Sequence, residues 1–177
     1  ALTLAGLLIK RGDLRDEAEA ERLLRRTVDG QKQTRGIAGA PKTLDAMETL
    51  ARLLVNRIRR QSGDVQCLLD KASPSQRDFE IEADKLLRLV VLERCKISEY
   101  SHKTLSSRRR LAEALHERFL RGGDNKDVSK AILADAEREA RILLDAHASL
   151  LQIDSVDGAI PLLREILKSM QKVEEAD

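Results

Sequence analysis

The stretch TLDAMETLARLL, residues 43–54, ends in a Leu-Ala pair that is followed three residues later by another leucine. The same Leu-Ala-x-x-Leu pattern occurs at residues 4–8 and again at residues 111–115. Apolar residues at this spacing lie on one face of an α-helix. Three copies in one chain indicate an internal repeat, and a repeat decides the fold.

Each copy is followed by a second pattern, Ala-x-x-x-Leu, within EAERLLRR at 19–26, EADKLLRL at 82–89 and EARILLDA at 139–146. Two helical patterns per copy predict antiparallel helix pairs. A small residue allows two helices to approach closely, and the leucines one turn away fill the space between successive pairs. We therefore expect six alanines to pack between helices: Ala5, Ala20, Ala51, Ala83, Ala112 and Ala140.

The periodicity predicts seven helices and no strands. Their expected ranges are 1–11, 16–35, 43–61, 78–97, 103–120, 127–151 and 157–173. Gly122 is expected to end one helix, and Asp or Asn after it to cap the next. Only three aromatic residues occur, so the core must be built from Leu, Ile, Val and Ala, which suits helices packed on helices.

The segments RGDLRDEAEAERLLRR at 11–26 and TRGIAGAPKTL at 34–44, followed by the opening stretch, resemble the tetratricopeptide repeat of the kinesin light chain type. The match is close over residues 1–54 and looser to about residue 150. The resemblance implies an all-α fold, a short right-handed α-solenoid of antiparallel helix hairpins. We expect one domain over 1–177, with repeats at about 1–42, 43–102 and 103–154 and a terminal helix at 157–173.

The spacing between the paired alanines departs from the family. It is about 12 residues in tetratricopeptide repeats, but 15, 32 and 28 residues in the three copies here. This predicts lengthened hairpin loops at 62–78 and at 121–127, and the residues VQCLL at 65–69 could form a short helix of their own.

In the resembled family, paired asparagines on the first helix of each repeat hold the backbone of a bound peptide. Glu48 and Thr49 occupy those positions in one repeat here, and Arg109 and Arg110 in the next, so the usual clamp is missing. Residues three or four apart still form one stripe on a helix. The candidate partner-binding strip consists of Asp45, Glu48, Arg52, Asn56, Ser106, Arg109, Glu113 and His116. The alternative is an ordinary solvated face.

Other chemistries find little support in the sequence. Arginines at 52–60 and 108–110 could contact RNA, but stacking aromatics are absent and the net charge is only +2. HERFL at 116–120 begins like a zinc-protease signature but lacks its second histidine. We expect no catalytic residues, no cofactor, no metal and no small-molecule substrate.

Length and composition bound the remaining classes. A chain of 177 residues can bury a core without disulfides, and Cys67 and Cys95 suggest an intracellular, reducing compartment, either cytoplasm or an organelle interior. No apolar run reaches the ~20 residues that span a bilayer. The sequence opens at Ala1 within an apolar pattern, as if a targeting segment had been removed or further residues preceded it.

These features together predict a noncatalytic scaffold or accessory subunit within a larger multiprotein assembly, with other proteins as its partners. A transient peptide-recognition adaptor that uses the strip is an alternative. An RNA-binding helical repeat protein is a weaker one, and it predicts binding that falls steeply with salt.

Overall fold

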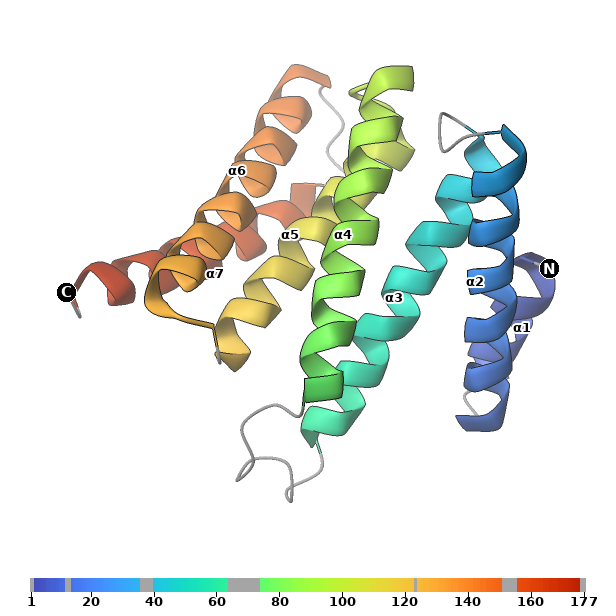
Figure 1. The fold of residues 1–177 in the computed structure, drawn as a ribbon. Coiled ribbons are helices and arrows are strands. Elements are labelled where there is room, and N and C mark those ends of the chain that lie inside the picture. The colour runs from blue at the N-terminus through green and yellow to red at the C-terminus, as the bar shows by residue number, and fades with distance from the viewer. Residues whose placement is uncertain are drawn as a thin grey trace. The chain divides into compact units, whose positions relative to one another are not determined.

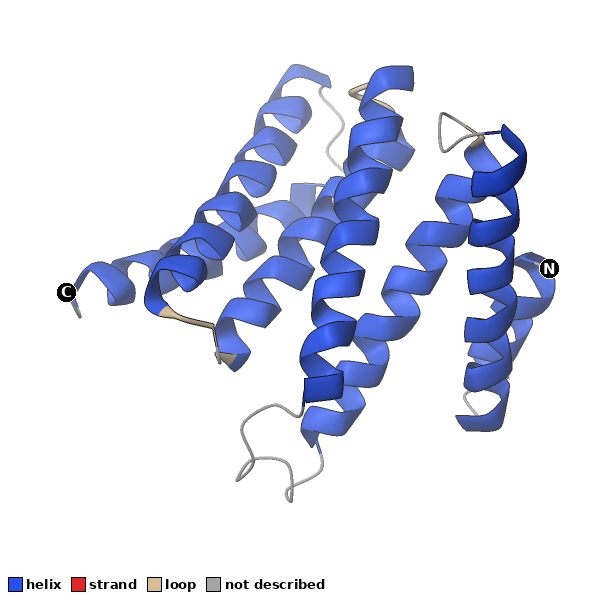
Figure 2. Ribbon diagram, in the orientation of Figure 1, coloured by secondary structure: helices blue, strands red, loops and turns tan. Residues whose placement is uncertain are grey.

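The computed structural model describes residues 2–11, 14–35, 40–63, 74–122, 124–150 and 156–175, and everything described is helix or short connection, with no strand (Figure 1, Figure 2). The predicted all-α class and the seven predicted helices are therefore confirmed for this part of the chain. The helices are α1 (Leu2–Arg11), α2 (Leu14–Arg35), α3 (Pro41–Gly63), α4 (Pro74–Ile97), α5 (His102–Arg121), α6 (Lys126–Leu150) and α7 (Val156–Glu175).

Local capping explains where α5 and α6 begin and end. The Ser101 hydroxyl accepts a hydrogen bond from the Thr104 backbone N–H at 3.2 Å, and so satisfies one of the free donors at the start of α5. Gly122 ends α5 with a φ of 72°, a conformation that favours glycine, and its N–H donates to the Phe119 carbonyl. The side chain of Asn125 then accepts from the Val128 N–H at the start of α6. The predicted stop and cap are both present.

The chain forms two compact units, residues 1–97 and 98–177. In the first unit α1 packs on α2, α2 on α3 and α3 on α4, and α1 also touches α3. Arg94 near the end of α4 binds Asp45 near the start of α3, so these two helices run antiparallel. In the second unit α6 packs on α5 and α7 packs on α6 and touches α5. A single domain and right-handed stacking over 1–177 stay predictions.

The repeat alanines lie at the helix contacts of both units. All six of them are between 0 and 2 % exposed. Most of the leucines that accompany them are buried as well, each contributing about 1.5–3 kcal/mol relative to an exposed side chain. Two repeat leucines differ: Leu4 on α1 is exposed, and Leu144 on α6 is half-buried against the cluster of Leu105, Leu143 and Ala146.

The prediction of a lengthened loop at 121–127 was wrong. Helix α5 continues to Arg121 and α6 begins at Lys126, so only residues 122–125 connect them. The extra spacing between Ala112 and Ala140 lies in the two long helices, because a helix can be extended without breaking its pattern of backbone hydrogen bonds. The other expected loop falls largely on residues 64–73, including the possible helix at 65–69, and these lie outside the described residues.

Candidate partner-binding strip

On α3 the predicted strip begins with two carboxylates, and both form ion pairs with one arginine of α4. Arg94 Nη2 lies 2.5 Å from Asp45 Oδ1, and Arg94 Nη1 lies 2.7 Å from Glu48 Oε2. Arg94 and Glu48 are both buried. The pairing crosses the α3–α4 hairpin and holds its helices in register, so Glu48 contributes to the interior of the hairpin and not to an open surface.

Further along α3 the strip is accessible. Arg52 is exposed and Asn56, one turn later, is half-buried. Their spacing of four residues keeps them on one stripe of the helix. The open part of the α3 half therefore consists of a cation and an amide.

The α5 half combines one exposed pair with one buried residue. Arg109 Nε donates to Glu113 Oε1 at 2.8 Å across one turn, and Ser106 one turn earlier is half-buried. An exposed pair at this spacing contributes only about 0.3–0.5 kcal/mol, so both side chains can turn towards a partner at little cost. The two halves lie in different units, and the strip as one surface stays a prediction.

His116, the last residue of the strip, lies inside the second unit. Its Nε2 is 3.1 Å from Ser169 Oγ on α7. The Ser169 hydroxyl donates to the Glu165 carbonyl at 3.0 Å, so its oxygen accepts from the histidine, and Nε2 carries the proton. Burial lowers the pKa of His116, against opposing effects of Glu165 and then Glu117. The residue fastens α7 to α5 and is not part of an exposed strip.

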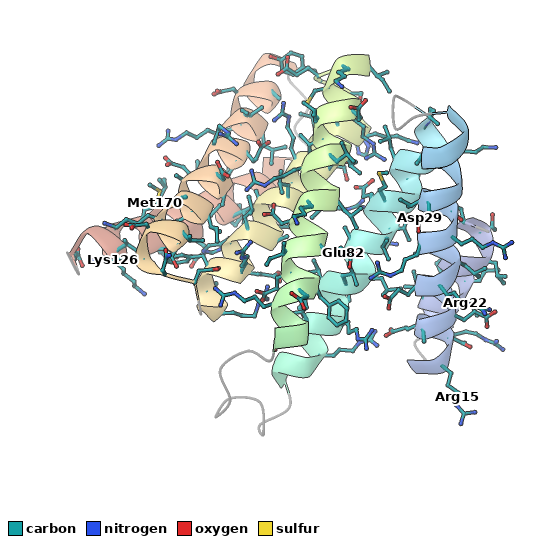
Figure 3. All side chains as sticks on the ribbon, in the orientation of Figure 1. Arg15, Arg22, Asp29, Glu82, Lys126 and Met170 are labelled. Carbon is teal, nitrogen blue, oxygen red and sulfur yellow. The ribbon has the colours of Figure 1, made fainter. Side chains whose placement is uncertain are left out.

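A second buried ion pair joins α5 to α6. Arg108 Nη1 lies 2.6 Å from Glu139 Oε2, and both residues are buried. A further ion pair joins α2 to α4, where Arg25 Nη2 donates to Glu82 Oε2 at 2.8 Å; Glu82 is labelled in Figure 3. By contrast, Arg15 and Arg22 extend from α2 into the solvent (Figure 3).

Sequence reasoning missed the buried arginines, although their spacing contains a signal. Arg94 follows Leu87 by seven residues, and Arg108 precedes Ala112 by four, so each lies on the apolar face of its helix. A charge on that face indicates a buried partner. The partner itself is far along the chain and cannot be read from local spacing.

The described residues contain no group of three His, Cys, Asp or Glu side chains that could hold a metal ion. Among the helices that the structure describes, none is long and apolar enough to cross a membrane.

No protein-family model matches this sequence, and no curated protein matches it either. Among solved structures the chain is similar to a protein from Podosopora anserina described as a kinesin light chain with nearly identical tetratricopeptide-like repeats. The two are 20% identical over 96% of this chain and 95% of that chain, with a TM-score of 0.24. A single-substitution variant of that protein gives the same values. Tetratricopeptide-like repeats of the kinesin light chain type are also the type that the motifs of this sequence resemble.

Proposed function

We propose that this chain is a noncatalytic scaffold or accessory subunit of a larger protein assembly. The observation that carries the proposal is the exposure of large apolar side chains on the first and last helices. Leu4 and Leu7 of α1 and Ile160 and Leu167 of α7 are exposed, although the leucines of α3 at the same repeat positions as Leu4 and Leu7 are buried. Apolar side chains gathered on one helix face are typical of protein contact sites.

The use of the buried charges supports a role without catalysis. Arg94 and Arg108 each neutralise a carboxylate of the neighbouring helix, at Glu48 and at Glu139. These pairs hold hairpins together. A catalytic group would instead be expected in a cleft, where it can reach a substrate.

The test is isolation of the protein under mild conditions, followed by native mass measurement and cross-linking. A scaffold is expected to elute at fixed stoichiometry with a partner. Its cross-links should come from lysines near the apolar helix faces, such as Lys10 on α1 and Lys168 on α7. Elution as a lone monomer, with scattered contacts of low occupancy, would contradict the proposal.

A second candidate, a transient peptide-recognition adaptor, is favoured by one observation. Arg52 on α3 and Arg109 on α5 are both exposed, where they could attract an acidic peptide. Saturable binding of a short acidic peptide should then weaken on Arg52→Glu or Arg109→Glu. Binding that is unchanged by both substitutions would remove this candidate.

A further inference from the structure

One face of α3 shows how this chain covers a row of apolar residues. Leu50 and Leu53 are 2 % and 4 % exposed, and Arg57, seven residues after Leu50, lies on the same side of the helix. Arg57 Nη1 donates to Glu21 Oε2 of α2 at 3.2 Å. Helix α2 therefore contacts α3 on this side, where the Arg57 guanidinium also lies over the Phe79 ring of α4.

Helix α1 presents the same face without a cover. Leu4, Leu7 and Arg11 repeat the spacing of the α3 residues. Yet Leu4 is 49 % and Leu7 is 58 % exposed. Arg11 lies 3.9 Å from Asp16 and is largely in solvent. Two leucines one turn apart, beside an exposed cation, form an apolar row for which no described element of unit 1 provides the contact that α2 gives to α3.

The charges show what kind of helix covers such a row. In the α2–α3 contact two glutamates four residues apart, Glu17 and Glu21, face Arg60 and Arg57. Because the earlier glutamate meets the later arginine, the covering helix runs antiparallel. Helix α1 has no acidic residue of its own, and it ends in Lys10 and Arg11. An acidic covering helix is complementary to this end of α1.

We infer that the face of Leu4, Leu7 and Arg11 docks an amphipathic helix of a partner protein, with an apolar stripe bordered by glutamates and running antiparallel to α1. The inference rests on the proposed scaffold function and names the kind of partner. A second copy of this chain is a poorer occupant, because the glutamates of its own α2 are already bonded to α3.

The experiment uses a labelled synthetic peptide with the sequence of residues 14–35, which forms α2 and contains both glutamates. Binding to the full chain is followed by fluorescence anisotropy. We expect saturable binding that the double variant Leu4→Glu/Leu7→Glu weakens at least about tenfold. Leu120→Glu is the control, since Leu120 on α5 is also an exposed leucine, at 63 %, and the substitution should leave binding unchanged.

A charge exchange tests the orientation. Arg11→Glu in the chain should weaken binding, and a peptide carrying Glu21→Arg should restore it. Absence of saturable binding would overturn the inference. So would binding that persists in the Leu4→Glu/Leu7→Glu variant, because the peptide would then be displacing the resident α2. Dimerisation of the chain that these two substitutions abolish would assign the face to a second copy, and would also overturn it.

The scaffold function can survive failure of this inference. If the Leu4→Glu/Leu7→Glu variant still elutes in an assembly of unchanged stoichiometry, the protein is a scaffold whose partner docks elsewhere. Loss of the assembly together with loss of peptide binding supports both statements. All of these variants change exposed side chains, so helix content and thermal unfolding should remain those of the parent protein, which shows that folding is intact.

Discussion

In residues 1–97 the buried arginine stands on the second helix of its hairpin, whereas in residues 98–177 it stands on the first. Arg94 of α4 reaches back to Asp45 and Glu48 on α3, and Arg108 of α5 reaches forward to Glu139 on α6. The alanines keep the same places in both hairpins, but the ion pair changes sides. Close approach of the helices thus requires the alanines at fixed positions, whereas a long arginine side chain can cross the contact from either helix.

Removal of either arginine should have the largest effect on stability. Arg94→Met removes the guanidinium that lies 2.7 Å from buried Glu48, and Arg108→Met leaves buried Glu139 with only the largely exposed Arg138, at 3.8 Å. The expected loss is about 3–5 kcal/mol in the free energy of unfolding, because a buried carboxylate that loses its close cation is strongly destabilising. Urea unfolding followed by circular dichroism measures it. The double variant Arg108→Met/Glu139→Leu is the control and should recover most of the loss.

Hydrogen exchange of the same two variants tests whether the two units open independently of each other. If residues 1–97 and 98–177 open separately, Arg94→Met should reduce protection only in α1 to α4, and Arg108→Met only in α5 to α7. Equal loss of protection throughout the chain would show that the units unfold as one domain.

Enlarging the repeat alanines should have the next largest effect. Ala51→Leu in α3 and Ala112→Leu in α5 place a large side chain where the alanine is 0 % exposed. We expect each to cost about 1–3 kcal/mol, because the neighbouring helix must move away. The half-buried Ala114 offers a control in the same helix as Ala112, and Ala114→Leu should cost less. Thermal unfolding curves that coincide for all three variants and the parent would contradict a packing role for the alanines.

The alanines could be predicted from the sequence because their consequence is local. A small residue in an apolar stripe indicates by itself that another helix packs closely there. The helix ranges follow from the same periodicity within a few residues. His116 and Glu48 could not be placed in this way. Each fits a polar stripe by spacing, yet each is covered by a residue distant in sequence, Ser169 and Arg94. Spacing identifies the face of a helix but not the neighbour on it.

Acidification should distinguish the units, since His116, whose pKa is lowered by burial, lies in residues 98–177. Burial lowers the pKa of His116 below its ordinary value of 6.5. Between the lowered pKa and 6.5 the unfolded chain binds more protons than the folded one, so folding stability falls as pH decreases through this window. Glu165 and then Glu117 oppose the shift, and the pKa of Glu165 is itself lowered by its hydrogen bond from Lys168 and, to a smaller extent, by Lys172.

The measurement is unfolding of the parent and of His116→Gln from neutral to mildly acidic pH. The free energy of unfolding of the parent should decrease as the pH falls, with hydrogen-exchange protection lost in α5 to α7. The variant should lose less stability over the same pH range. An identical pH dependence of the two proteins would show that His116 does not contribute.

The smallest effect is expected for the ion pair between α2 and α4. Arg25 and Glu82 form two short contacts, as close as those of Arg94, but their side chains are 38 % and 34 % exposed. Water screens an exposed pair, so Arg25→Gln should cost only about 0.5 kcal/mol, and the difference should shrink between about 0.1 M and about 1 M salt. Parallel urea titrations at the two salt concentrations test this. If Arg25→Gln lowered the free energy of unfolding as much as Arg94→Met does, the distance between the charged groups would determine the strength of these pairs. A small loss that depends on salt would show that burial determines it.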